Sequence, residues 1–221
     1  MTSFAKFGSA AALLCLPING IAEPVIEEVI VTSSRISMPL RQVGTSVSIV
    51  SAADIQQRGF SSLYQILRTQ PGVAASNAGG PGKASTLRIR GEEGFRTLVL
   101  LDGIDISDTS SPQVSPRMEQ LLSSGIGRVE ILRGPQGLMY GADAGGVINI
   151  TSLEPNDDSI GQLSAEAGKY GTTEYAGNVG ADMGAFDVAL TATRLETDGF
   201  NARSTDTALR DDDGFQNTTL H

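Results

Sequence analysis

Among the side chains that could do chemistry, a run of aspartates stands out in one segment near the end of this chain. The segment Thr197–Phe215 reads TDGFNARSTDTALRDDDGF and carries three consecutive aspartates before Gly214. Clustered carboxylates repel one another unless water or a shared cation separates their charges. Asp-x-Asp-Gly is typical of part of a calcium loop, since hard oxygen ligands and a tight glycine turn suit calcium. The EF-hand pattern fails because no glutamate follows at its twelfth position, so a solvated acidic loop remains the alternative.

The other polar residues do not form a catalytic set. The only histidine is His221, which excludes histidine-based triads and histidine zinc sites. Asp102, Asp105 and Asp108 are spaced like a carboxylate cluster, but turn positions explain them better. We therefore expect a protein that is not an enzyme.

A glycine-rich segment with a lysine, Ser76–Ser85, invites comparison with a phosphate-binding loop. The comparison fails, because the first glycine of that pattern would fall on Asn77. In addition, Ala84 stands where Ser or Thr must bind magnesium. The segment is interpreted as a turn-rich loop rather than a nucleotide site.

Composition excludes further classes. The chain has 221 residues, 40% of them hydrophobic, and a formal net charge of −9. This length is enough for one good core or two small domains. Phosphate binding needs a basic face, so the acidic balance argues against a nucleic-acid partner.

The first 22 residues indicate a secretory signal peptide. Lys6 supplies a positive start, Phe7–Leu16 is an apolar run, and Gly20 and Ala22 are small residues that suit a cleavage site. Cleavage would remove Cys15, the only cysteine, so no disulfide is expected. After this segment no run of about 20 apolar residues predicts a transmembrane helix.

The region from about residue 43 to residue 152 predicts a small α+β domain. Ser51 is a plausible N-cap, and Gly59 a plausible end, for a helix over Ala52–Arg58. Ser61 or Ser62 could cap a second helix. The expected elements further include a helix from Ser115-Pro116 to Leu122 and strands at Val47–Val50, Leu87–Arg90, Thr97–Leu101 and Arg128–Arg133.

Beyond Pro155 polar and apolar residues alternate. The alternating segments are Gln162–Lys169, Tyr175–Ala181 and Phe186–Leu195, with a fourth beginning near Asn217. Segments of about ten alternating residues with short turns are typical of a transmembrane β-barrel, and a soluble β-meander is the alternative. The smallest barrels need 8 strands of ~9–11 residues, or roughly 72 residues before turns. Only about 61 residues follow Ile160, so we expect an incomplete barrel and an N-terminal fragment.

Three linked blocks lie in the stretch Gly125–Leu153, whose two ends read as strands. They are VEILRGP at Val129–Pro135, YGADA at Tyr140–Ala144 and GGVINI at Gly145–Ile150. In this order they resemble the end of the plug domain of TonB-dependent outer-membrane receptors. The resemblance implies an α+β plug domain (a four-stranded mixed sheet with short helices), followed by the first antiparallel strands of the barrel. The implied segments are a signal peptide at 1–22, a periplasmic segment at 23–42, the plug at 43–155 and barrel strands at 156–221.

The resemblance also implies a function and partners. Such receptors take up a scarce nutrient across the outer membrane, with the plug inside the barrel and the N-terminus in the periplasm. The segment EEVIVTSSR resembles a Ton box, which pairs as an added strand with the energy-coupling protein TonB. The implied TonB-binding residues are Glu28, Val29, Ile30, Val31 and Thr32.

Three further sets of residues follow from the family. Arg90 and Arg133 close the motifs IRG and LRGP, and the family's arginines there join glutamates of the barrel wall, with Glu130 a further member. A surface charge pair is the alternative. The acidic loop resembles the calcium-binding loop of vitamin B12 receptors, and the matching ligands are Asn201, Asp211 and Asp213. The substrate-contacting positions would be Ala84, Thr86 and Glu93.

The substrate remains open between two classes. The resemblance favours cobalamin, although none of the three plug positions carries the vitamin B12 receptor's residue. Ferric siderophores are the second candidate, and the plug sequence does not separate them. A periplasmic plug-like binding module that transports nothing is the alternative from another functional class.

Overall fold

The computed structural model describes residues 30–31, 38–39, 44–110, 112–134, 145–154, 160–184, 186–201 and 213–221. The expected signal peptide, the YGADA block and the site residues Glu28, Val29, Thr32 and Asp211 lie outside these ranges. The two central residues of the expected Ton box form β1 (Ile30–Val31), which pairs antiparallel with β2 (Met38–Pro39).

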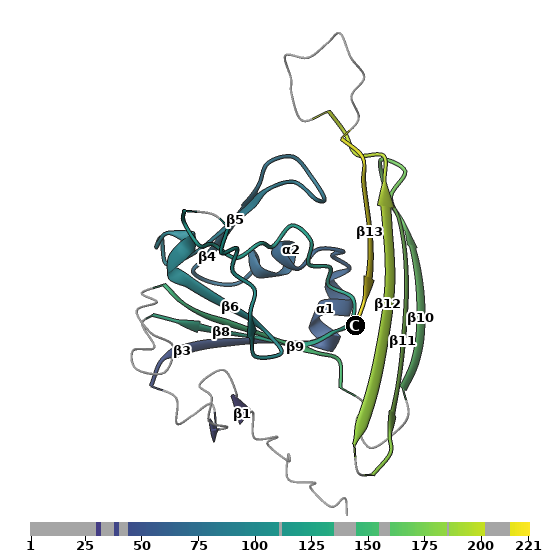
Figure 1. Cartoon of the computed structure of the whole chain (residues 1–221), viewed down its shortest axis with the longest axis horizontal. Coiled ribbons are helices and arrows are strands. Elements are labelled where there is room, and N and C mark those ends of the chain that lie inside the picture. The colour runs from purple at the N-terminus through teal and green to yellow at the C-terminus, as the bar shows by residue number, and fades with distance from the viewer. Residues whose placement is uncertain are drawn as a thin grey trace, which may run out of the picture.

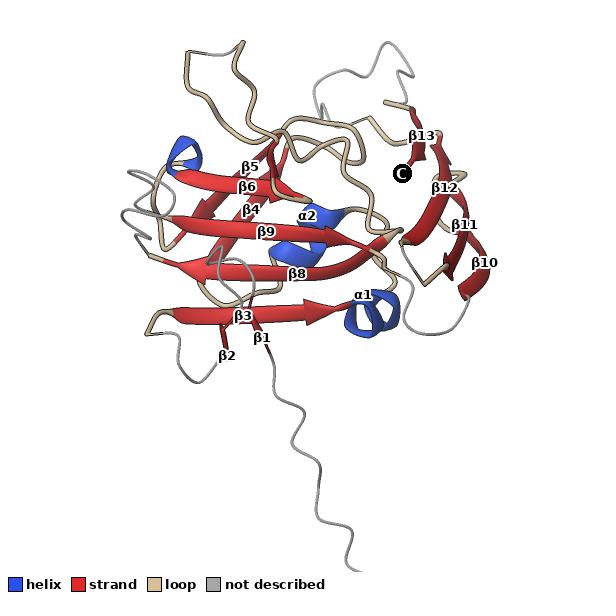
Figure 2. Ribbon diagram, turned by 60° about the horizontal axis from the view of Figure 1, so that its bottom comes forward, coloured by secondary structure: helices blue, strands red, loops and turns tan. Residues whose placement is uncertain are grey.

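A mixed sheet forms the centre of the first part of the chain (Figure 2). Its strand order is β3-β8-β9-β6-β7. The strands are β3 (Ser46–Ser51), β8 (Ile126–Arg133), β9 (Gly146–Ser152), β6 (Thr97–Leu101) and β7 (Ile104–Asp105). β6 and β9 are parallel and the other neighbours are antiparallel, so the expected α+β class with a mixed sheet is confirmed.

The expected number of four strands in this sheet is wrong, because Asp102 and Gly103 turn the chain back to form β7. Both residues have positive φ, 48° and 81°, as a two-residue hairpin turn requires. The strand expected at Leu87–Arg90 also differs. It lies at β5 (Ser85–Ile89) and forms a separate hairpin with β4 (Val73–Asn77). The strand β4 was not predicted from the sequence.

Two helices cover the sheet. α1 (Ala52–Arg58) has the expected bounds, since the Ser51 hydroxyl accepts from Asp54 N and the Asp54 carboxylate accepts from Ser51 N. Ser62 is the N-cap residue of α2 (Leu63–Leu67), but its side chain makes no capping hydrogen bond. Its hydroxyl instead donates to the Leu121 carbonyl oxygen at 3.4 Å. A short 3₁₀ turn, η2 (Gly94–Arg96), precedes β6.

The helix expected over Ser115–Leu122 is wrong. This segment is irregular and forms isolated bridges from Pro116 to Ser107 and from Leu122 to Ser62. Eight residues are too few to hold a helix without tertiary support. The backbone here instead pairs with distant segments, since the Leu121 carbonyl oxygen accepts from Leu63 N.

The main core lies between the sheet, the two helices and the β4-β5 hairpin. Most of its side chains are aliphatic and almost completely buried, with members from every one of these elements. A smaller cluster, Leu100, Leu132 and Val147, lies on the opposite face of the sheet. None of the helices in the described ranges is long and apolar enough for a membrane crossing.

A second, four-stranded sheet stands beside this domain (Figure 1). Its strands are β10 (Ile160–Ala167), β11 (Thr173–Asp182), β12 (Asp187–Thr197) and β13 (Phe215–Leu220), all antiparallel in sequence order. These are the four strands expected from the alternating pattern. We call this sheet the wall, and residues 44–154 the plug unit.

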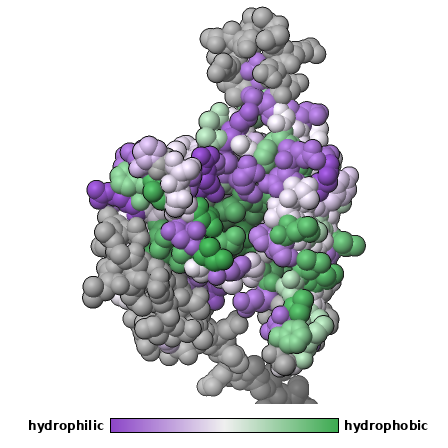
Figure 3. All heavy atoms as spheres, in the orientation of Figure 1, coloured by the Kyte–Doolittle hydropathy of each residue, from purple (hydrophilic) through white to green (hydrophobic). Residues whose placement is uncertain are grey.

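The two faces of the wall differ, as alternation along a strand requires. The buried residues Ala176, Thr193 and Leu195 face the plug unit. The opposite face exposes large apolar side chains, namely Leu163, Tyr175, Val179, Val188, Leu190 and Leu220. Figure 3 shows hydrophobic residues over the lower part of the wall and hydrophilic ones above them.

Candidate functional site

The tip of the β4-β5 hairpin contacts the wall where the expected acidic loop begins and ends. Lys83 Nζ lies 2.7 Å from Asp213 Oδ1. Gly82 packs so closely on the ring of Phe215 that any Cβ at this position would overlap it. The Asn77 side chain holds the tip by accepting from Gly79 N at 2.9 Å and donating to the Lys83 carbonyl oxygen at 2.9 Å. The hairpin tip is therefore shaped to touch the wall.

A cavity of about 550 Å³ lies behind this contact. Its aromatic lining comes from Tyr64 of α2, from Phe215 of β13, and from Tyr170 and Phe200 in the segments that follow β10 and β12. The rings of Tyr170 and Phe200 are 5.2 Å apart. Ligand pockets usually enclose about 300–1,000 Å³ and are mainly apolar with a few polar groups. Sequence reasoning missed these aromatic residues, since they lie singly and far apart in the chain.

The three expected substrate-contacting residues lie outside this cavity. Ala84 and Thr86 are exposed on β5 or next to it, and Glu93 is exposed shortly after that strand. The Thr86 hydroxyl is 2.7 Å from that of Ser76, and Glu93 pairs with Arg88 at 3.0 Å. Alternation places Ala84, Thr86 and Arg88 on one face of the hairpin, so the structure gathers the three positions on a single exposed surface.

A loop beside Ala84 is fixed by a charge cluster. Arg117 donates to the Asp108 carboxylate at 2.7 and 2.9 Å and pairs with Glu119 at 3.0 Å. Hydrogen bonds from Ser110 and Arg117 lower the pKa of Asp108 to about 2. Ala84, Asp108 and Arg117 line a common hollow of about 310 Å³. Asp108, interpreted from the sequence as a turn residue, therefore also fixes this loop through its bonds to Arg117.

Arg90 and Arg133 are brought together at the edge of the plug unit. Both side chains pack around Gly72. Arg133 is only 4% exposed and donates from Nε to the Pro71 carbonyl oxygen at 2.6 Å and from Nη2 to Ser48 Oγ at 2.7 Å. Burial and the nearby Arg90 charge lower the pKa of Arg133. Within the described ranges no carboxylate pairs with the Arg133 guanidinium.

Glu130 does not join the two arginines. It is three residues from Arg133 on the same strand, and an odd spacing places the two side chains on opposite faces of the sheet. Glu130 is completely buried, and its Oε1 lies 2.8 Å from Arg128 Nη2. The structure therefore separates the pair of buried Glu130 and partly exposed Arg128 from Arg90 and Arg133.

The expected calcium ligands are only partly described. Asn201 is partly buried at the end of the described segment after β12, and Asp213 is paired with Lys83. Among the described residues, no three or more His, Cys, Asp or Glu side chains form a group that could hold a metal ion. Asp213 receives the positive charge of Lys83, and the calcium site stays a prediction.

The chain has a small α+β unit whose hairpin tip and polar loops pack on an antiparallel wall. This arrangement defines the class of plug-containing proteins. Residues 39–148 match the family described as "TonB-dependent Receptor Plug Domain", and the chain belongs to this family. The chain is 33% identical over 215 residues to the vitamin B12 transporter BtuB of Photobacterium profundum. The matched region covers 96% of this chain and 35% of that protein. It is 30% identical over 211 residues to the BtuB of Vibrio vulnificus strain CMCP6, over 90% of this chain and 33% of that protein.

The chain thus spans about a third of the length of these curated relatives. Among solved structures it resembles the alcaligin outer-membrane receptor FauA of Bordetella pertussis, with a TM-score of 0.62, 19% identity, and coverage of 76% of this chain and 29% of that one. It also resembles the ferric yersiniabactin receptor FyuA of Yersinia pestis, with a TM-score of 0.58, 22% identity, and coverage of 80% and 28%. At these identities the likeness shows the fold. The relatives are transporters and receptors and not enzymes, in agreement with the expectation for this chain.

Proposed function

We propose that the chain serves TonB-dependent uptake of a scarce nutrient across the outer membrane, with the plug unit gating a barrel to which the wall contributes the first strands. The observation that supports this most directly is the match of residues 39–148 to the plug family, followed by a wall with one apolar exposed face. An outward apolar face opposite a polar inner face is what a lipid-facing barrel strand requires. The division into a signal peptide at 1–22, a Ton-box segment at 23–42, a plug at 43–155 and barrel strands at 156–221 belongs to this proposal.

Cobalamin is the first candidate substrate. The relatives at 33% and 30% identity are named as vitamin B12 transporters. The siderophore receptors among the solved structures keep ferric siderophores as the second candidate. The aromatic cavity suits either class, because both present large ring systems or chelates with polar edges.

The proposed coupling to TonB can be tested at the Ton box. The short β1 strand shows that Ile30 and Val31 accept an extended conformation. A Val31→Pro change removes a backbone donor that strand addition needs. In a receptor carrying this change, uptake of labelled cobalamin should collapse to the level of a strain without TonB, while binding to cells persists.

The matched control is Val31→Thr, which keeps the backbone N–H and the β-branched shape and should transport normally. Normal uptake by the Val31→Pro receptor would contradict the Ton-box assignment. If neither cobalamin nor a panel of ferric siderophores is taken up by the unmodified receptor, the transport proposal itself is wrong.

A further inference from the structure

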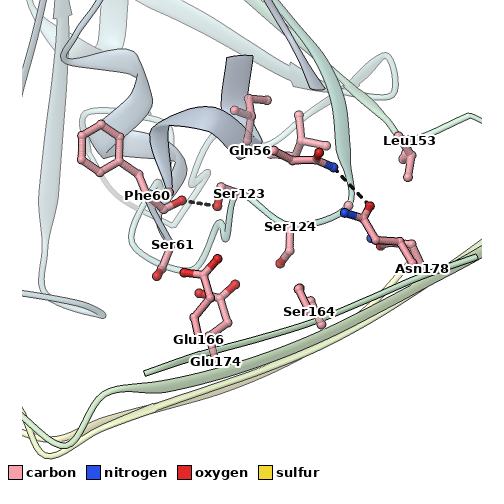
Figure 4. Close-up of a pocket in the computed structure, with 16 residues that line it drawn as sticks. Gln56, Phe60, Ser61, Ser123, Ser124, Leu153, Ser164, Glu166, Glu174 and Asn178 are labelled. Carbon is pink, nitrogen blue, oxygen red and sulfur yellow. Dashed lines mark hydrogen bonds between the residues drawn. The ribbon is translucent and has the colours of Figure 1, made fainter. Parts of the chain in front are cut away.

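A second cavity, of about 170 Å³, lies between the plug unit and the wall (Figure 4). Its plug side includes Ser61 and Ser124, and its wall side includes Glu166, Glu174 and Asn178. The volume exceeds the roughly 10–15 Å³ that one water molecule needs. Among the described residues that line it there are two carboxylates and no Lys, Arg or His.

The two carboxylates are direct neighbours. Glu166 on β10 and Glu174 on β11 are cross-strand partners in the antiparallel register. Figure 4 shows their side chains next to each other, both extending toward Ser61. Like charges directly opposite each other destabilise a strand pair. Glu166 is exposed and Glu174 is buried, and no described residue that lines the cavity brings a positive charge to this carboxylate pair.

Oxygen atoms in this cavity also lack partners. Glu174 is 8% exposed and Asn178 is 9% exposed. In the described part of the chain, neither Glu174 Oε2 nor Asn178 Oδ1 has a hydrogen-bond partner. Because an unsatisfied buried acceptor is destabilising, buried acceptors in native structures have a partner with few exceptions.

The plug unit adds more oxygen atoms to the same space. The hydroxyls of Ser61 and Ser124 lie beside the Glu174 carboxylate. Ser124 also hydrogen-bonds to Thr193 of the wall at 2.8 Å, and Gln56 donates to Gln162 of the wall at 3.1 Å. These bonds hold the two units in register around the cavity, so the oxygen atoms of both units face one another at a defined separation.

We propose that this cavity binds a divalent cation with the ligand preferences of calcium, held between the plug unit and the wall. Glu166, Glu174 and Asn178 provide wall oxygens, and Ser61 and Ser124 provide plug oxygens. An all-oxygen set with two carboxylates matches a doubly charged hard cation, whereas zinc sites in proteins use mostly nitrogen and sulfur. Calcium accepts 6–8 oxygen ligands in irregular geometry, and water completes the shell. The ion then joins the two units, independently of any transported substrate.

Calcium binding to the full chain in detergent micelles, measured by isothermal titration after chelation, tests this inference. The background is Asp211→Asn plus Asp213→Asn, so that the acidic loop cannot contribute. In this background one calcium ion should bind per chain. Glu174→Gln should weaken that binding at least tenfold, and Ser61→Ala plus Ser124→Ala should weaken it measurably. Glu196→Gln is the matched control, because Glu196 lies on the other face of the wall and pairs with Arg194.

Three results would overturn the proposal. The first is no calcium binding in the Asp211→Asn plus Asp213→Asn background. The second is unchanged affinity in the Glu174→Gln chain or, if that chain fails to fold, in an Asn178→Leu chain used in its place. The third is a calcium affinity that changes with the wall substitutions only, since the ion would then not join the two units.

Discussion

The ammonium of Lys83 lies 2.7 Å from the carboxylate of Asp213, although 130 positions separate the two residues. This pair joins the tip of the plug hairpin to the end of the acidic loop, directly before β13 of the wall. The Lys83 side chain is 36% exposed and that of Asp213 is 27% exposed, so the pair is only partly shielded from water. The pair therefore contributes little to the stability of the fold, but it joins the plug unit to the wall beside the aromatic cavity.

Replacing Lys83 with methionine should loosen the hairpin tip without unfolding the protein. A partly exposed ion pair contributes about 0–1 kcal/mol, so the free energy of unfolding should change by less than about 1 kcal/mol. Hydrogen exchange at Gly79–Lys83 should become faster, because the tip loses its tie to the wall. Arg88→Met is the control, as the Arg88–Glu93 pair lies within the plug unit. Equal exchange in both variants would contradict the tie.

Removal of Arg133 should cost far more stability than removal of Arg90. Arg133→Met removes the hydrogen bonds that this 4% exposed guanidinium donates to the Pro71 carbonyl oxygen and to Ser48 Oγ, and a hydrogen bond to a charged group contributes about 1.5–3 kcal/mol. Arg90 is exposed, and replacing it removes a positive charge that lies near the Arg133 guanidinium. Arg90→Met should therefore change the free energy of unfolding by less than about 1 kcal/mol. Urea titration of both variants measures the difference, and a larger effect at Arg90 would show that the assigned roles are reversed.

The carboxyl of Asp108 should titrate at about pH 2 in the folded protein. Its pKa is lowered from 3.8, so its stabilising contribution is present above the unfolded pKa and is lost as pH falls through about 2. Arg117→Ala removes the donors on its Oδ2 atom, and the pKa should rise toward 3.8 while the Ser110 bonds keep it below that value. NMR titration of the Asp108 side chain measures both. An unchanged pKa in the Arg117→Ala protein would mean that the guanidinium does not hold this loop.

Elements with strong local signals were predictable from the sequence. The Ser51 capping box and Gly59 define α1, and the continuous apolar run Thr97–Leu101 is a buried central strand with the expected bounds. The wall strands follow from alternation, because one face packs on the plug unit and the other is exposed. In each case the deciding interactions lie within a few residues or repeat with a regular period.

Features that depend on distant contacts were not predictable. Val73–Asn77 becomes a strand only because Ser85–Ile89 pairs with it, and Ser115–Leu122 is irregular because it bridges to Ser107 and Ser62. Motif spacing brought Arg90 and Arg133 together correctly. It did not reveal that Glu130 lies on the other face of the same sheet, where it pairs with Arg128.

The exposed face of the wall should tolerate a charge near Gln216 but not at Val179. Val179 lies among apolar residues of that face and is 55% exposed, whereas Gln216 is opposite Glu196 at the polar end of the wall. If lipid covers the apolar part, an arginine at its centre costs about 2–4 kcal/mol and one near the interface about 0–1 kcal/mol. Val179→Arg should therefore lower the free energy of unfolding in lipid vesicles by that larger amount, and Gln216→Arg should leave it nearly unchanged. In lipid-free buffer a water-covered face would accept both, so equal and small effects in vesicles would show that this face does not contact lipid.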